Sequence, residues 1–135
     1  IKRGSVVILE VNKDDNFHID ETSHYIKRII GLPGDRVKWI NNKLYINDEE
    51  YNEPYFPKDY FGTAATNNFD GLFRYIDENG NEQVTEIIPE GYYFVMGDNR
   101  PISKDSRSIG LIPEKNIIGV ATYHMNFIIP RGKIK

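Results

Sequence analysis

Short runs of apolar residues, separated by polar segments, recur along most of the chain. The first run extends from Val6 to Val11, and a second, from Tyr25 to Ile30, follows a polar stretch from Asn12 to Ser23. Runs of this length that are rich in β-branched and aromatic residues are typical of strands. We therefore expect a strand at each run and a loop between them.

Two hairpins are expected further along the chain. Arg36 to Ile40 and Lys43 to Ile46 flank the pair Asn41-Asn42, and asparagine tolerates the left-handed backbone that a tight turn needs. A second hairpin is expected from Leu72 to Ile87, with its turn at Glu78-Asn79-Gly80. Two more strands are expected at Tyr92 to Met96 and at Asn116 to Phe127.

The pattern indicates a mostly β fold. No segment repeats its apolar residues at helical spacing over ten residues with capping residues at its ends, so we expect short helical turns at most. Tyr51 to Asn68 contains prolines, a glycine and small polar residues, which predicts a loop. The simplest architecture is one domain, 1–135, with a β core made by residues 1–50 and 89–130 and a smaller hairpin excursion, residues 51–88, inserted into it.

Composition narrows the classes of function. The 135 residues fit a single domain, and a hydrophobic content of 39% is sufficient for a core. The net charge of −3 argues against nucleic acid as a partner. The absence of cysteine excludes disulfides, thiol nucleophiles and cysteine-ligated zinc. The three histidines, His18, His24 and His124, do not have the spacing of metal ligands.

The apolar runs and the ends of the sequence indicate how the protein could relate to a membrane. No apolar run approaches the roughly 20 residues that a membrane-spanning helix needs. The sequence begins at Ile1 rather than Met and enters a strand pattern almost at once. We interpret this as a piece of a longer protein. Tyr123 to Ile129 is apolar enough to rest on a bilayer interface, although closing the β core is an equally good explanation.

The segment from Tyr25 to Asp35 is a candidate for chemistry. Residues alternate between the two faces of a strand, so Lys27 and Arg28 each lie between apolar neighbours, on opposite faces. One interpretation is an edge strand that its cations protect against aggregation. The other is a desolvated lysine, whose lowered pKa lets it act as a neutral general base.

A second candidate segment, Gly97 to Gly110, directly follows an apolar strand. Its glycine, asparagine, proline and serine residues are also those of a solvated turn. It nevertheless contains two acid and arginine combinations, Asp98 with Arg100 and Asp105 with Arg107, which could fix the shape of a loop by charge-assisted hydrogen bonds. The segment also holds three hydroxyl side chains, those of Ser103, Ser106 and Ser108.

These segments resemble the type I signal peptidase family, the membrane-anchored serine proteases that remove signal peptides from exported proteins. Lys2 to Ile8 resembles the family's R-G-D-h-V-h-h strand, in which h is an apolar residue. Tyr25 to Asp35 matches Y-I-K-R-h-I-G-L-P-G-D, and Gly97 to Arg107 matches G-D-N-R-x-x-S-x-D-S-R. The resemblance implies a signal-peptidase-like β core of antiparallel sheets and a serine endopeptidase that needs no cofactor.

The resemblance assigns roles to two residues of a Ser-Lys dyad mechanism. Lys27 corresponds to the general base, and Ser103 to the serine whose hydroxyl orients that lysine. The family's nucleophile lies in an S-M-x-P-T box ahead of the first strand, and no serine of this chain corresponds to it. Ser5 replaces the aspartate of the first box and is interpreted as an ordinary strand residue, and Ser23 as a solvent-exposed or capping residue.

The resemblance also implies residues that support the site and residues that bind substrate. Asp105 and Arg107 would form a structural ion pair behind the site, and Asp98 would be an acid near Arg28, the arginine that follows the lysine. Tyr25 and Ile26 would flank shallow pockets for the small side chains at positions −1 and −3 of a signal peptide, which would add as a strand. For Tyr25, ordinary packing in the core or at an edge is an equally good interpretation.

Two other interpretations stay open. An inactive signal-peptidase paralogue would bind export substrates or a partner without cutting them, and it would have lost dyad residues. A self-cleaving repressor would share the Ser-Lys dyad, but it would carry a DNA-binding domain and lack the Gly97 to Arg107 box. The leading hypothesis places the protein at the extracytoplasmic face of the bacterial cell membrane, anchored there, with signal peptides of secreted preproteins as partners.

Overall fold

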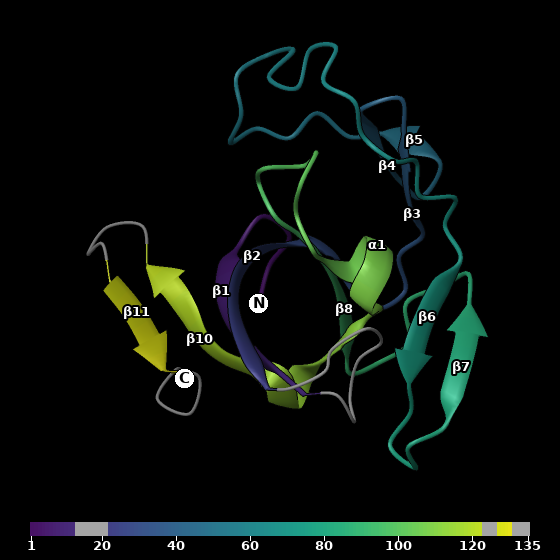
Figure 1. The fold of residues 1–135 in the computed structure, drawn as a ribbon, viewed down its shortest axis with the longest axis vertical. Coiled ribbons are helices and arrows are strands. Elements are labelled where there is room, and N and C mark those ends of the chain that lie inside the picture. The colour runs from purple at the N-terminus through teal and green to yellow at the C-terminus, as the bar shows by residue number, and fades with distance from the viewer. Residues whose placement is uncertain (13–21, 123–126, 131–135) are drawn as a thin grey trace.

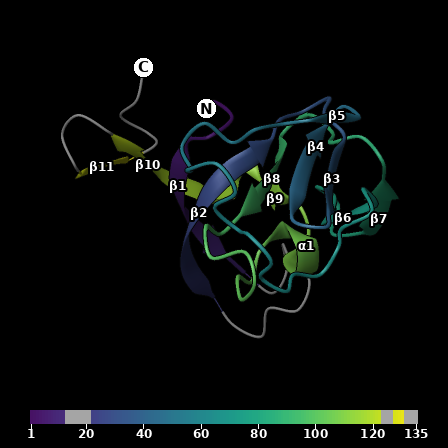
Figure 2. The same ribbon diagram turned by 90° about the horizontal axis from the view of Figure 1, so that it is seen from above.

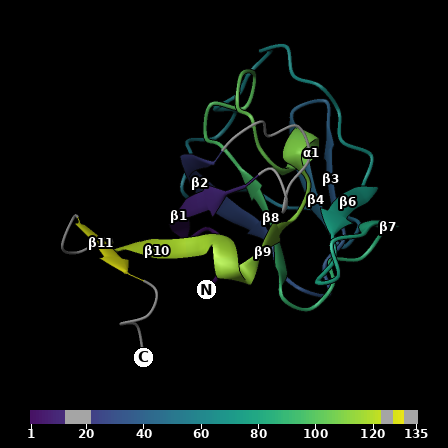
Figure 3. The same cartoon turned by 60° about the horizontal axis from the view of Figure 1, so that its bottom comes forward.

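A six-stranded antiparallel sheet forms the centre of the molecule (Figures 1, 2 and 3). The computed structural model describes residues 1–12, 22–122 and 127–130. The order of strands in the sheet is β11-β10-β1-β2-β8-β9. The strands are β1 (Val6–Val11), β2 (Ser23–Gly31), β8 (Tyr92–Met96), β9 (Ile112–Pro113), β10 (Ile117–Thr122) and β11 (Phe127–Pro130). The expected mostly β, antiparallel fold is confirmed.

Two smaller sheets lie on the side of the molecule away from β10 and β11 (Figure 1). One contains β3 (Val37–Ile40), β4 (Lys43–Ile46) and β5 (Glu49–Glu50), and the other β6 (Phe73–Ile76) and β7 (Glu82–Thr85). The β3–β4 turn is the expected one, because Asn41 and Asn42 have φ of 50° and 65°. The hairpin expected within Leu72 to Ile87 is β6 and β7.

Helical structure in the described part of the chain is limited to two short pieces. These are α1 (Ser106–Ile109) and the 3₁₀ turn η1 (Glu114–Asn116). None of the helices among the described residues is long and apolar enough to cross a membrane.

The strand expected from Asn116 to Phe127 is wrong as a single element. Asn116 belongs to η1, β10 ends at Thr122, and Phe127 begins β11. β10 and β11 are two strands that pair antiparallel, with Val120 opposite Ile129. The idea that Tyr123 to Ile129 rests on a bilayer concerns side chains outside the described residues.

The main sheet buries one cluster of apolar side chains. Val7, Leu9 and Val11 alternate along β1 and are each 0% exposed, as the period of a half-buried strand requires. They pack with Ile29, Val95, Ile109, Ile112 and Ile117, among others. Within the sheet β1 lies between β2 and β10, where Val7 is opposite Val120.

A second cluster joins the smaller sheets to the face of β8. Trp39 of β3 packs there with Phe94 and Met96 of β8. Phe69 and Phe73, which lie in the segment 51–88, belong to the same cluster. The segment expected as an inserted excursion thus shares its core with the remainder of the domain, while its boundaries stay a prediction.

Candidate active site

Lys27 and Ser103 meet at the point where strand pairing ends. In the β2–β8 ladder, Arg28 lies opposite Met96, the last residue of β8. Lys27, which pairs with Val7 of β1, therefore lies one residue beyond the β2–β8 pairs, where the chain after β8 leaves the sheet as a loop. The Nζ of Lys27 donates a hydrogen bond of 2.9 Å to the Oγ of Ser103, 76 residues away in sequence. The two residues that the family resemblance pairs are thus brought together.

Gly97 allows this close approach. Its backbone N–H donates both to Ser103 Oγ and to Asp105 Oδ2, at 3.0 Å in each case. A Cβ atom on Gly97 would lie 2.1 Å from Ser103 Oγ and 3.2 Å from Lys27 Nζ. Any larger residue would have to displace Ser103. The glycine is therefore required by the packing of the site, and the sequence pattern did not single it out.

The buried side chain of Asp105 fixes the shape of the loop that follows β8. It is 1% exposed and caps α1 by accepting a hydrogen bond from the N–H of Arg107. The guanidinium of Arg107 also donates to both of its carboxylate oxygens, at 2.9 and 2.8 Å. Ser106, next along the chain, accepts a hydrogen bond from Val95 N, which ties the loop back to β8. The structure thus contains the predicted pair of Asp105 and Arg107.

Asp98 lies near Arg28, the residue after Lys27, as the resemblance implies. Arg28 donates to both carboxylate oxygens of Asp98, at 3.0 and 2.9 Å, and to the carbonyl oxygen of Gly4 at 2.8 Å. The combination of Asp98 with Arg100, which adjacency in the sequence suggested, is wrong. Asp98 reaches across to β2, whereas the side chain of Arg100 is buried elsewhere.

Arg100 forms a buried pair that the sequence analysis missed. Its side chain is 0% exposed, and it donates two hydrogen bonds to the carboxylate of Glu53, at 2.6 and 2.7 Å. Its Nε donates to the carbonyl oxygen of Gly97 at 2.8 Å. The guanidinium lies 5.0 Å from the ring of Trp39 and 4.9 Å from that of Phe61. Glu53 lies 47 residues earlier, and the only signal for it was an acidic residue beside an aromatic run.

The surroundings of Lys27 change its pKa. Burial lowers the pKa of Lys27 below its usual 10.5, while Asp105 opposes this shift and Arg107 adds to it. The Nζ lies 5.2 Å from the ring of Tyr25, which packs partly against the β1 cluster. Ile26, on the opposite face of β2, is 67% exposed. A half-buried amine beside a fixed hydroxyl is suited to proton transfer.

Ser5 is not the strand residue that was expected, because it lies just before β1, which begins at Val6. Ser5 Oγ accepts a hydrogen bond from Lys2 N, and the Ser5 carbonyl accepts one from Ile29 N. Ser23 is the first residue of β2, opposite Val11. Ser103 is thus the serine that the structure joins to Lys27 by a hydrogen bond.

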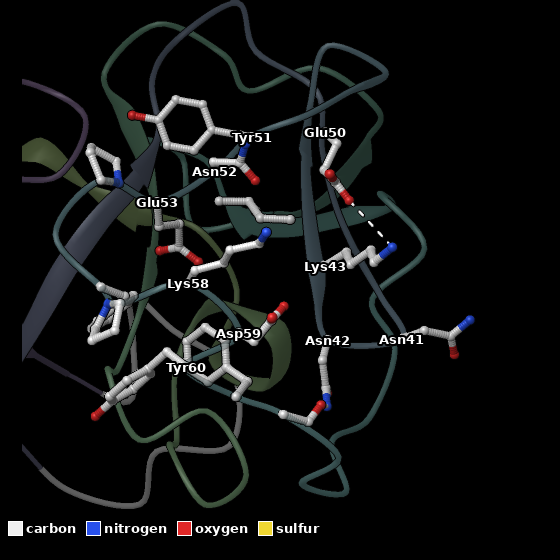
Figure 4. Close-up of a pocket in the computed structure, with 16 residues that line it drawn as sticks. Asn41, Asn42, Lys43, Glu50, Tyr51, Asn52, Glu53, Lys58, Asp59 and Tyr60 are labelled. Carbon is white, nitrogen blue, oxygen red and sulfur yellow. Dashed lines mark hydrogen bonds and ion pairs between the residues drawn. The ribbon is translucent and has the colours of Figure 1, made fainter.

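A surface hollow lies apart from this site (Figure 4). It is lined by the β3–β4 turn and the segment after β5, and its lining includes neither Lys27 nor Ser103. Lys43 and Glu50 form an exposed ion pair at its edge. Among the residues that the structure describes, no three histidine, aspartate or glutamate side chains gather as they would around a metal ion. The chemical candidate is therefore the pair of Lys27 and Ser103.

Comparison with known proteins places the chain in a family. The family model described as "Signal peptidase, peptidase S26" matches residues 1–126. Signal peptidase IB of Staphylococcus aureus is 38% identical over 126 residues, which cover 91% of this chain and 60% of the relative. Signal peptidase I of Streptococcus pneumoniae is 36% identical over 127 residues, covering 78% of this chain and 62% of the relative.

A solved structure agrees with the sequence comparison. The crystal structure of a signal peptidase I from Enterococcus faecalis superposes with a TM-score of 0.63 at 27% identity, covering 90% of this chain and 97% of that one. This chain spans about 60% of the length of the curated relatives from Staphylococcus aureus. The matched residues include both sides of the Lys27–Ser103 contact, and the chain belongs to the type I signal peptidase family.

Proposed function

We propose that this chain is the catalytic domain of a serine endopeptidase that removes signal peptides from exported proteins. The observation that carries the proposal is the hydrogen bond from Lys27 Nζ to Ser103 Oγ, formed at a half-buried position. The membership of the chain in the signal peptidase family supports it. By the same argument we propose attachment to the membrane at its extracytoplasmic face, with signal peptides as substrates.

The proposed chemistry is acyl transfer with Lys27 as general base. A neutral amine takes the proton of a serine hydroxyl as that oxygen attacks the scissile carbonyl, and the protonated lysine then returns a proton to the leaving amine. Ser103 receives hydrogen bonds from Gly97 N and Lys27 Nζ. It thereby fixes the direction of the amine and leaves the lone pair of the nitrogen free to accept the proton.

The nucleophile and the binding of substrate are further parts of the proposal. The sequence boxes resemble a family whose nucleophilic serine precedes the strand of Lys2 to Ile8, so we assign the nucleophile to a segment outside residues 1–135. The exposed Ile26 and the partly buried Tyr25 flank Lys27 on β2. We propose that they border the pockets for the small side chains of the substrate, which lies alongside as a strand.

Substitution of Lys27 by arginine tests the proposal directly. In the encoded protein that carries the preceding segment, Lys27→Arg should abolish cleavage of a substrate ending in Ala-X-Ala, because a guanidinium stays charged at any working pH. The acidic limb of the wild-type rate profile should lie below 10.5, the usual pKa of lysine, because burial lowers the pKa of Lys27. Residues 1–135 alone should leave the substrate intact.

Three results would contradict the proposal. Turnover in Lys27→Arg at wild-type rates would exclude Lys27 as the base. Specific cleavage by residues 1–135 that depends on Lys27 would show that the nucleophile lies within them. Binding of the substrate without cleavage by the wild-type encoded protein would favour the inactive paralogue.

A further inference from the structure

We propose that Glu53 is a positioning residue of this site. The strap, defined here as residues 53–61, contacts the two arginines that flank the proposed dyad: Arg28, next to Lys27 in sequence, and Arg100, three residues before Ser103. Through these contacts Glu53 keeps the Ser103 hydroxyl against the Lys27 amine. The inference deepens the proposed function and rests on it for its consequence in catalysis, but its physical test requires no catalysis.

The first contact of Glu53 leads to Ser103. Its carboxylate accepts hydrogen bonds from both terminal nitrogens of Arg100. The Nε of Arg100 in turn donates to the carbonyl oxygen of Gly97. The N–H of that same Gly97 donates to Ser103 Oγ. The carbonyl oxygen of Arg100 accepts a hydrogen bond from Arg107. A shift of the Arg100 side chain would therefore disturb Gly97, whose N–H holds Ser103 Oγ.

The second contact of Glu53 leads to the strand of Lys27. The Tyr55 hydroxyl donates to Glu53 Oε2 at 2.5 Å, and the Tyr55 ring lies 3.9 Å from the guanidinium of Arg28. Burial raises the pKa of Tyr55, and the neighbouring carboxylate of Glu53 adds to that rise, so the hydroxyl stays a donor. One carboxylate thus connects to residues on both sides of the Lys27–Ser103 contact.

The burial of the Glu53–Arg100 pair indicates that the pair fixes the geometry of the loop rather than adding stability. The side chains are 6% and 0% exposed, so both charges lose most of their hydration, and well-packed apolar residues would often be at least as stabilising. What an apolar pair lacks is the fixed geometry of two parallel hydrogen bonds. The neighbouring Glu50–Lys43 pair, at 3.6 Å with side chains 45% and 63% exposed, offers no such constraint (Figure 4).

The test measures the titration of Lys27 in residues 1–135, using NMR of chains labelled with ¹³C at the lysine Cε. The Lys27 signal is assigned by its loss in Lys27→Arg. Glu53→Gln should raise the apparent pKa of Lys27 toward 10.5, because a displaced loop would let water reach the amine. Removal of a negative charge by itself would lower the pKa of a lysine, so the sign separates repositioning from direct electrostatics.

Matched variants make the test specific. Glu50→Gln, which removes the exposed carboxylate nearby, should leave the titration of Lys27 unchanged. Tyr55→Phe keeps the ring over Arg28 and removes only the hydrogen bond to Glu53, so it should give a smaller rise. Glu53→Asp keeps the charge and should restore part of the wild-type value. If Glu53→Gln fails to fold, Tyr55→Phe and Glu53→Asp decide the question.

Two outcomes would overturn the inference. One is a folded Glu53→Gln chain in which Lys27 titrates as in the wild type, and the other is an equal shift in Glu50→Gln. In the encoded protein, Glu53→Gln should lower kcat more than it raises KM, because Lys27 and Ser103 belong to the reacting centre. A shifted Lys27 titration in a protein that cleaves no substrate in any form would keep the positioning role and reject the proposed protease.

Discussion

The Ser103 hydroxyl accepts hydrogen bonds from a side chain and from the backbone, and these two contacts have different consequences. The bond from Lys27 bears on the proposed chemistry, whereas the bond from Gly97 bears on the loop. Gly97 N–H also donates to Asp105 Oδ2, so loss of the Ser103 hydroxyl leaves this buried donor with a partner. Orientation of the base and stability of the loop can therefore be separated by substitution.

Ser103→Ala should change the free energy of unfolding by only about 1 kcal/mol, while turnover of the encoded protein falls about 100-fold or more because the base is no longer oriented. Urea denaturation and a signal-peptide cleavage assay measure the two effects. Ser108→Ala is the control, since Ser108 Oγ donates to the Asp105 carbonyl in the same loop without touching Lys27. Equal losses of turnover in both variants would contradict the orienting role.

Gly97→Ala tests the packing of the site by adding a single methyl group. The added Cβ would lie 2.1 Å from Ser103 Oγ, so the serine has to move and the Lys27 contact is lost. Overpacking of this kind typically costs about 1–3 kcal/mol, and we expect turnover to fall at least as far as in Ser103→Ala. Gly80→Ala adds a methyl group at a turn with φ of 82° and no atom within 4 Å, so it shows the effect of backbone strain without overpacking, a strain that Gly97 does not have. Retention of full activity by Gly97→Ala would show that Ser103 needs no fixed place.

At the scale of elements, α1 is too short to be stable by itself and depends on its cap. It has four residues, and Asp105 both caps it and pairs with Arg107. Removal of this carboxylate would leave the Arg107 side chain, which is 13% exposed, with only the Arg100 carbonyl as acceptor, and Gly97 N–H with only Ser103.

Asp105→Ala should therefore lower the free energy of unfolding by about 3 kcal/mol, the combined effect of a lost cap and a broken buried pair. Chemical denaturation monitored by the fluorescence of Trp39 provides the measurement. Glu50→Ala, which breaks an exposed pair, should change it by less than about 0.5 kcal/mol. A similar small change in Asp105→Ala would mean that water can replace the carboxylate.

Elements whose signals are local could be predicted from the sequence. The alternation of Val7, Leu9 and Val11 predicts β1, and Asn41-Asn42 predicts the turn between β3 and β4. The resemblance to the family's sequence motifs predicted that Lys27 and Ser103 act together, although no local pattern in the sequence relates them. Strand type and turn chemistry depend on near neighbours, which a sequence displays directly.

Features that depend on distant partners were missed or misassigned. Adjacency in the sequence suggested that Asp98 pairs with Arg100. In the structure, Arg28 lies opposite the end of β8 on the neighbouring strand β2 and forms the ion pair with Asp98. Arg100 then pairs with Glu53, which reaches it only after the chain has folded past β5. An acidic residue in an apparently plain loop gives no sign of a buried partner, so this pair could not be predicted.

At the scale of the whole molecule, the segment 51–88 shares one of the two core clusters with β3 and β8. Phe73 of β6 is 1% exposed, and its ring centroid lies 5.6 Å from that of Phe94 on β8. Phe69 pairs with Trp39 as an isolated bridge, and its ring lies tilted against those of Phe73 and Phe94, at 5.6 and 4.9 Å between centroids. Because β8 contributes to both clusters, with Phe94 in one and Val95 in the other, we expect the domain to unfold in a single transition.

Phe73→Ala should therefore lower the stability of the whole domain, by about 3–5 kcal/mol, in one transition. Calorimetry and circular dichroism should report the same midpoint. Val84→Ala, in the partner strand β7 and 58% exposed, should change the midpoint little. A separate early transition in Phe73→Ala would show that residues 51–88 fold as an independent subdomain.

The central place of β1 determines the order in which a growing chain can fold. Its partner β2 emerges soon after it during synthesis, but its other edge waits for β10, since Val7 pairs with Val120. Until Ile117–Thr122 has been made, an apolar strand keeps an unpaired edge, which is the kind of surface through which nascent chains aggregate. The long stretch of chain between β1 and β10 therefore closes into a loop late in folding. We expect the domain to fold slowly relative to chains with mostly local contacts, and the unpaired edge of β1 to need protection from aggregation during synthesis.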